Sequence, residues 1–204
     1  MLHNTTINRD NIDEIFECFS KHFSQHSNKP IDIYVVGGSS IVINFVYRES
    51  TVDIDALYEE SEQLNQSIVE TANELELPND WLNHDFINTL SFTNKIIKVS
   101  DYYRTYNNMN VYVVEPLYLI AMKLKSSRPT GGDLDDIIKM IYELRCNETD
   151  ISYEKIMEAY DYLYDDRSNT YDSFFKKTKE AFDVPIEEAK EILKHEKQMR
   201  HLFK

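Results

Sequence analysis

The chain has 204 residues, of which 42% are hydrophobic and 12% aromatic, and its formal net charge is −14. This hydrophobic content is sufficient for a folded core, so the acidic charge does not indicate a disordered tail. The charge argues against a broad non-specific nucleic-acid surface, and the apolar runs are far shorter than the ~20 residues of a membrane helix. Two cysteines far apart in the chain, and no basic and apolar leader, favour a cytoplasmic protein.

The first part of the chain predicts a helix, a strand, a second helix and a second strand. Apolar residues at helical spacing predict the first helix over residues 10–25, and Ile31–Val36 predicts a short buried strand. The Gly-Gly-Ser-Ser segment at 37–40 ends this strand, and its serines are suited to cap a following helix. The segment Val52–Leu57, which alternates strictly at first, predicts the next strand. The apolar residues of the helix after the glycines are Ile41, Val42, Phe45 and Val46.

The later elements predict an α+β fold, with an α/β-like core formed by a small sheet between helices and a helical C-terminal portion. The domain boundary is expected after residue 127, with the α/β-like core in residues 1–127 and the helical portion in residues 128–204. Before it we expect a helix over 60–76, a short turn or helix at Trp81–Leu82, strands at Ile96–Tyr102 and Val111–Val114, and a helix from Glu115–Pro116. After it we expect helices over 133–146, 151–165, 170–181 and 185–203.

Two aspartates on the strand at 52–57 point to a divalent metal. Residues two apart on a strand lie on one face, about 7 Å apart, so Asp53 and Asp55 share a face while Val52, Ile54 and Ala56 are expected to face the core. Like charges on one face repel unless a cation lies between them. Mg²⁺ prefers oxygen ligands together with substrate phosphates, so the pair predicts a Mg²⁺ site for phosphoryl transfer.

The glycine pair supplies a candidate phosphate site. The chain contains four glycines, as Gly37-Gly38 and Gly131-Gly132. At the first pair the backbone can approach a triphosphate closely, and the helix that follows offers free N–H groups and two hydroxyl groups, from Ser39 and Ser40. Taken alone, the glycine pair would favour a tight turn, and the two aspartates alone would favour a solvated strand face. The two motifs together favour nucleotide chemistry. At the second pair the acidic neighbours favour a hinge.

These residues resemble the signature of the DNA polymerase beta-like nucleotidyltransferase superfamily. Residues 48–57 (Arg-Glu-Ser-Thr-Val-Asp-Ile-Asp-Ala-Leu) resemble, more narrowly, a group of small predicted nucleotidyltransferases related to the AbiEii-type toxins. Three further segments are similar to that group: 77–83 (Leu-Pro-Asn-Asp-Trp-Leu-Asn), 119–124 (Leu-Ile-Ala-Met-Lys-Leu), and Arg128-Pro129 followed by 133–137 (Asp-Leu-Asp-Asp-Ile). The resemblance covers residues 35–140 and implies a small mixed nucleotidyltransferase sheet.

The resemblance also implies roles for single residues. Asp53 and Asp55 would hold the metal and act in catalysis, together with Lys123 and with Asp136, for which Asp133 is the alternative. The nucleotide would bind to Gly37, Gly38, Ser39, Ser40, Arg48 and Thr51. Many members of the superfamily have a third carboxylate on a later strand, for which Asp101 and Glu115 are the candidates here. A solvated lysine and helix-capping aspartates are the structural alternatives for Lys123, Asp133 and Asp136.

A separate group of potential metal ligands is Cys18, His22 and His26, which occupy one face of the first predicted helix. The sequence shows no fourth ligand for them, so an ordinary helix face is the expectation.

The combined features predict a Mg²⁺-dependent enzyme that transfers NMP from an NTP, such as ATP, to a hydroxyl or phosphate acceptor. The acceptor could belong to an RNA end, a protein or a small molecule. The resemblance implies an RNA end, such as that of tRNA, and a toxin–antitoxin or phage-defence setting with an antitoxin or other protein partner. Two alternatives stay open: a non-catalytic nucleotide-binding or antitoxin-like interaction module, and a nucleotidyltransferase acting on small molecules.

Overall fold

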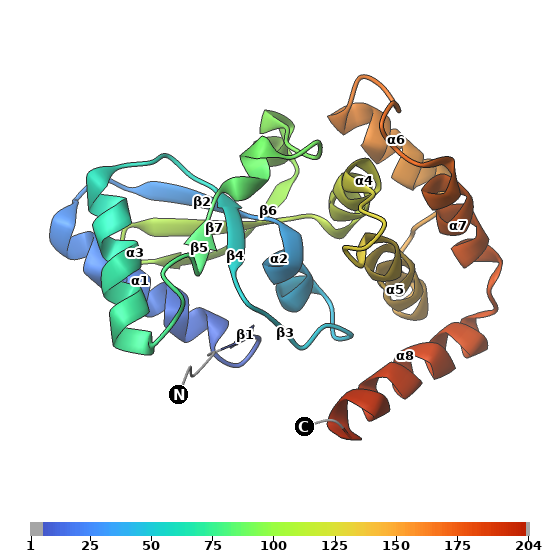
Figure 1. The fold of residues 1–204 in the computed structure, drawn as a ribbon, viewed down its shortest axis with the longest axis horizontal. Coiled ribbons are helices and arrows are strands. Elements are labelled where there is room, and N and C mark those ends of the chain that lie inside the picture. Colours follow the sequence, from blue (N-terminus) through green and yellow to red (C-terminus); the bar gives the residue numbers. More distant parts are fainter. Residues whose placement is uncertain (1–5, 203–204) are drawn as a thin grey trace. The chain divides into compact units, whose positions relative to one another are not determined.

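The computed structural model describes residues 6–202, which form an α+β fold with a helical C-terminal part, as predicted (Figure 1). Contacts divide the chain into two compact units. The first contains most of residues 6–115, and the second contains residues 45–47, 89–95 and 116 onward. The helix at Pro116–Ser126 groups with the helices that follow it. The domain boundary expected after residue 127 stays a prediction.

A mixed five-stranded sheet forms the centre of the first unit, in the strand order β5-β4-β2-β7-β6. The β2/β7 and β4/β5 pairs are parallel, whereas β2/β4 and β6/β7 are antiparallel. At one edge β5 has only two residues, and at the other edge β6 is irregular between Tyr102 and Arg104. The bounds are β2 Ile31–Val35, β4 Ile54–Leu57, β5 Leu82–Asn83, β6 Ser100–Tyr106 and β7 Met109–Val114, with a separate antiparallel pair of β1 Ile7–Asn8 and β3 Ser50–Thr51.

Two helices of the first unit, α1 (Ile12–His26) and α3 (Glu62–Leu75), lie side by side and share a core with the sheet (Figure 1). The helical spacing of apolar residues in α1 is the reason: Ile12, Ile15, Phe16, Phe19 and Phe23 are all buried. Alternate residues of β2 and β7 complete the core from the sheet. The other helical segments of this part of the chain are α2 (Gly37–Asn44) and the 3-10 helices η1 (Asp85–Asn88) and η2 (Asn94–Lys98).

The second unit is helical. Helix α4 packs against α5 and α6, and α5 packs against α7 and α8. The four helices predicted after residue 128 are all present, with ends within three residues of the expected positions. Among the described residues, no helix combines the length and hydropathy needed to cross a membrane. The bounds are α4 Pro116–Ser126, α5 Asp133–Cys146, α6 Tyr153–Leu163, α7 Asp172–Asp183 and α8 Ile186–Leu202.

The structure corrects two of the predicted strands and turns. The strand expected from Ile96 begins at Ser100, because Ile96 and Val99 are buried at the three-residue spacing of a 3-10 helix while Ile97 is exposed. The turn expected at Trp81–Leu82 is partly strand, since Leu82 pairs with Ile54 of β4.

Two expectations for the segment around the glycines are also wrong. Helix α2 begins at Gly37 itself, so Ser39 and Ser40 lie inside it, and it ends at Asn44, so Phe45 and Val46 lie beyond it. The expected core position of Val52 is wrong as well: the side chain is 61% exposed because β4 starts only at Ile54.

Candidate active site

Contact between α2 and β4 defines the candidate site in the first unit (Figure 1). Gly37 has a φ of +64°, a conformation that glycine adopts without steric cost. A Cβ atom at this position would lie 2.5 Å from Oδ2 of Asp55. The close approach of backbone and carboxylate therefore requires glycine for two independent reasons.

Gly38 also has little space around it. Its Cβ would lie 2.8 Å from Oγ1 of Thr51 and 3.0 Å from Nη2 of Arg48. The two glycines thus lie against Arg48, Thr51 and Asp55, all of which were predicted to belong to one site. A close backbone approach beside an arginine and a carboxylate is a suitable geometry for a metal-bound phosphate chain.

Sheet pairing fixes this contact. The N–H of Val36 donates to the carbonyl of Asp55 at 2.9 Å, directly beyond the antiparallel pair Val35 and Ala56. The pairing of β2 with β4 therefore places the glycines, which follow β2, beside Asp55. A one-residue shift in register would move Asp55 to the opposite face of the sheet.

The two serines are placed differently from what a phosphate-binding role suggests. Ser39 and Ser40 are fully buried, and their hydroxyl groups donate to the carbonyls of Val36 at 3.0 Å and Gly37 at 2.8 Å. These bonds hold the first turn of α2 closed. A contact of either hydroxyl with nucleotide stays a prediction.

The two aspartates are half-buried, on either side of the fully buried Ile54. Asp53 directly precedes β4, and Oγ1 of Thr51 lies at hydrogen-bond range, 3.5 Å, from its Oδ1. Asp55 lies within β4 beside Gly37. Carboxylate oxygens of this kind fit a hard divalent cation such as Mg²⁺.

Asn83 is a candidate ligand that the sequence analysis missed. In the parallel β4/β5 pair it is the register partner of Asp55, so both side chains lie on the same face. Its Oδ1 accepts a hydrogen bond from the N–H of Asp85 at 3.0 Å. Asn83 is the last residue of the 77–83 segment noted in the sequence, but its position beside Asp55 follows only from the pairing of β5 with β4.

The two candidates for a third carboxylate are on or next to strands other than β4, and their role stays a prediction. Asp101 is on β6 and Glu115 directly follows β7, and in the strand order β2 and β7 separate β6 from β4. Burial, together with the charge of Asp101, raises the pKa of Glu115. Asn83, an amide, is the polar residue directly paired with Asp55.

The second unit contains the other predicted catalytic residues as one buried cluster. The Nζ atom of Lys123 lies 3.0 Å from Asp133 and 2.8 Å from Asp136. Lys123 and Asp136 are buried and Asp133 is fully buried. The hydroxyl of Tyr47, which belongs to the same unit, lies 3.1 Å from the Asp136 carboxylate. The helix that carries Lys123 therefore directs it inward, and the alternative of a solvated lysine is wrong.

Asp133 is the more firmly held of the two aspartates. It accepts hydrogen bonds from the backbone N–H, Nε and Nη2 of Arg128 and from Lys123, at 2.9–3.1 Å. Burial alone would raise the pKa of Asp133, but the bonds from Arg128 and the charge of Lys123 outweigh it and hold this pKa well below its usual range. The residue that caps α5 is Gly132, in a left-handed conformation, so neither aspartate is the cap.

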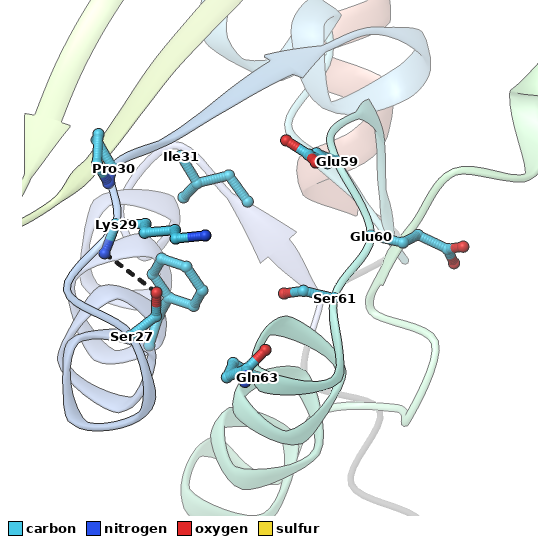
Figure 2. A pocket seen from close by; sticks show the side chains of 9 residues that line it. Ser27, Lys29, Pro30, Ile31, Glu59, Glu60, Ser61 and Gln63 are labelled. Atoms are coloured by element: carbon cyan, nitrogen blue, oxygen red, sulfur yellow. Dashed lines mark hydrogen bonds between the residues drawn. The ribbon is translucent and has the colours of Figure 1, made fainter.

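A hollow of about 190 Å³ lies at the other end of β2, between the end of α1 and the start of α3 (Figure 2). One hydrogen bond crosses its wall, from the N–H of Lys29 to the hydroxyl of Ser27 at 3.1 Å. No predicted site residue lines it; the lining residues are Phe23, Ser27, Lys29, Pro30, Ile31, Glu59, Glu60, Ser61 and Gln63.

Comparison with family models decides the class of the protein. Residues 11–192 match a family described as "Nucleotidyltransferase of unknown function (DUF6036)". The chain belongs to this family. The match to the nucleotidyltransferase family includes both the glycine–aspartate contact of the first unit and the lysine cluster of the second. Neither the curated proteins nor the solved structures gave a match.

Proposed function

We propose that this nucleotidyltransferase transfers NMP from an NTP to an acceptor and depends on Mg²⁺. The acceptor oxygen attacks the α-phosphorus, the bond from this phosphorus to the oxygen bridging to the β-phosphate breaks, and pyrophosphate leaves. A hydroxyl acceptor releases its proton to water. The observation that supports this proposal most is the contact of Gly37 with the Asp55 carboxylate.

The donor set fits the proposed ion. Asp53, Asp55 and the amide oxygen of Asn83 are oxygen donors, the type that Mg²⁺ prefers. When bound, Mg²⁺ would neutralise triphosphate charge and polarise the reacting phosphate. The role of the protein itself is to hold the nucleotide. The backbone of Gly37 and Gly38 approaches the phosphates, and Arg48 offers a guanidinium beside them.

The roles of Lys123 and Asp136 remain part of the proposal. Within their own unit the lysine is already neutralised by two aspartates, so its first effect is to hold this cluster together. We propose that Lys123 contributes in catalysis as a charge held in a fixed position by Asp133 and Asp136. Asp136 is the better candidate for a direct role, because Asp133 is saturated by Arg128 and Lys123.

The proposed acceptor is the end of an RNA, as the resemblance to AbiEii-type toxins implies. Within the first unit, the basic Arg104 is paired with Asp13 at 2.9 Å, and the chain as a whole has a net charge of −14. Both facts favour recognition of a limited RNA end over binding along a long RNA. An antitoxin partner belongs to the same proposal.

The decisive experiment is incubation with each α-labelled NTP, Mg²⁺ and total RNA, followed by separation of RNA, protein and small molecules. We expect label on RNA, and no label with chelator or with Asp53→Ala/Asp55→Ala. The matched control is Asp172→Ala/Asp183→Ala, which removes two exposed aspartates of α7. Label on protein or on small molecules instead would reassign the acceptor, and equal labelling by the Asp53/Asp55 variant would refute the site.

One observation favours a second function, nucleotide binding without catalysis. The residue paired with Asp55 is an asparagine, and an amide cannot act as a general base. This alternative predicts NTP binding that depends on Gly37 and Arg48, with no label transferred to any acceptor. Equilibrium binding of a labelled NTP, measured beside the transfer assay, separates the two functions.

A further inference from the structure

A group of metal-ligand residues lies between α1 and α3, two helices of the first unit. Cys18, His22 and His26 follow each other at four-residue intervals on α1, so they share one face. Glu70 and Glu74 are one turn apart on α3, which packs against α1. The sequence alone shows no fourth ligand because the glutamates are about fifty residues away, and packing of the helices supplies them.

Three of these residues converge on one point. The thiol of Cys18, a ring nitrogen of His22 and a carboxylate oxygen of Glu74 all lie within 4.8 Å of one another. The Nε2 atom of His22 is 2.9 Å from Glu74. Zn²⁺ binds sulfur at about 2.3 Å and nitrogen or oxygen at about 2.0–2.2 Å, so ligand atoms with these separations can reach one ion after small side-chain adjustments.

The surroundings orient the histidine for such a role. The Nδ1 atom of His22 is 3.3 Å from Oε2 of Glu70, so this carboxylate can accept a hydrogen bond from Nδ1–H while Nε2 lies beside Glu74. The same oxygen is 2.7 Å from Nε2 of His26, and Gln66 donates to the other oxygen of Glu70 at 2.9 Å. A carboxylate behind a ligating histidine is the usual second layer of protein zinc sites.

Solvent access and the types of donor atom also fit a metal ion. Cys18 is buried, whereas the side chain of Glu74 is 59% exposed, so the group opens to solvent on one side. This opening gives an ion a path of entry and leaves a position for water. The mixture of sulfur, nitrogen and oxygen donors suits Zn²⁺ and is unlike the oxygen donors that Mg²⁺ prefers.

We propose that Cys18, His22 and Glu74 bind one Zn²⁺ ion, with Glu70 as a positioning residue for His22. Binding replaces the thiol proton of Cys18, which is released to solvent, by a sulfur–zinc bond. The ion links α1 to α3 and stabilises the first unit. This site is separate from Asp53 and Asp55, and it does not rest on the proposed transfer reaction.

The test uses the full chain after metal removal, titrated with Co²⁺ and then with Zn²⁺. We expect near-ultraviolet thiolate-to-cobalt absorption with one Co²⁺ per chain, its displacement by Zn²⁺, and a higher melting temperature with Zn²⁺. Cys18→Ser should abolish the thiolate band, Glu74→Gln should weaken binding, and Glu70→Gln should weaken it about 10–100-fold.

Two controls make the result specific. Cys146→Ser removes the other free cysteine, which lies in the second unit, and should leave the spectrum unchanged. Asp53→Ala/Asp55→Ala should keep Zn²⁺ binding while losing nucleotide transfer, so failure of one proposal is distinguishable from failure of the other. The zinc proposal is overturned if Co²⁺ gives no thiolate band, if the band persists in Cys18→Ser, or if Cys146→Ser removes it.

Discussion

Gly37 and Asp55 are in contact across α2 and β4, and the space between the glycine backbone and the carboxylate is too small for a methyl group. A side chain at residue 37 would displace the carboxylate that is proposed to hold the metal. The glycine therefore protects the position of Asp55 as much as it allows the turn.

This contact predicts that Gly37→Ala has two separable costs. The positive φ costs about 1–2 kcal/mol for a residue with a Cβ, and crowding against Asp55 adds about 1–3 kcal/mol. Gly132→Ala is the matched control, because Gly132 has a φ of +75° and nothing within 4 Å of its Cβ position. Denaturant unfolding should show a larger loss for Gly37→Ala, and only this variant should lose NTP binding.

Asn83→Ala is predicted to weaken the use of Mg²⁺. If the amide oxygen supports the ion beside Asp55, its removal should raise the Mg²⁺ concentration for half-maximal activity about tenfold, in the range seen for groups that support metal ligands. The measurement is activity against Mg²⁺ concentration. An unchanged midpoint would exclude Asn83 from the metal site.

Lys123→Met is predicted to destabilise the second unit strongly. It removes the lysine cation from the buried Asp136 and one of the two cations beside Asp133, where Arg128 remains, and breaking a buried ion pair typically costs about 3–5 kcal/mol. Lys139→Met is the comparison: Lys139 is also buried, but its partners Asp135 and Glu196 are solvent-exposed to 64% and 36%, so the loss should be below about 1 kcal/mol. Equal losses in denaturant unfolding would contradict this difference.

The stability of the protein should depend on Asp133 at acid pH. Its pKa in the folded protein lies below its value in the unfolded chain, so on acidification the unfolded chain takes up the proton first. The stabilising contribution is therefore complete above about pH 4 and is lost as the pH falls further. Asp133→Asn should lower stability at neutral pH and flatten the acid limb of a plot of unfolding free energy against pH.

Elements with a regular pattern were predictable from the sequence, because their own residues determine them. The spacing in α1 and the alternation at Ile54 and Ala56 both correspond to buried positions. Ile96 and Val99 were misassigned because Ile96, Ile97 and Val99 are β-branched residues, which favour a strand, whereas only Ile96 and Val99 are buried.

Contacts between distant segments were predictable only where a motif joined them. The order of Gly37 and Asp55 in the sequence suggested one site, and the structure places them in contact. Asn83 and Glu74 gave no such signal, because their places depend on strand pairing and on helix packing, which are settled by the whole fold. The third carboxylate, for which Asp101 and Glu115 are the candidates, stays a prediction.

The two edges of the five-stranded sheet have a consequence for the behaviour of this protein in a crowded cell. One edge strand is two residues long, and the other is interrupted by an irregularity, so neither offers a long, flat row of unpaired backbone groups. A strand of a second chain would therefore find few backbone groups with which to pair at either edge. The fold therefore discourages intermolecular β-pairing and the fibres that follow from it, while β4, which carries Asp55, lies in the interior of the sheet.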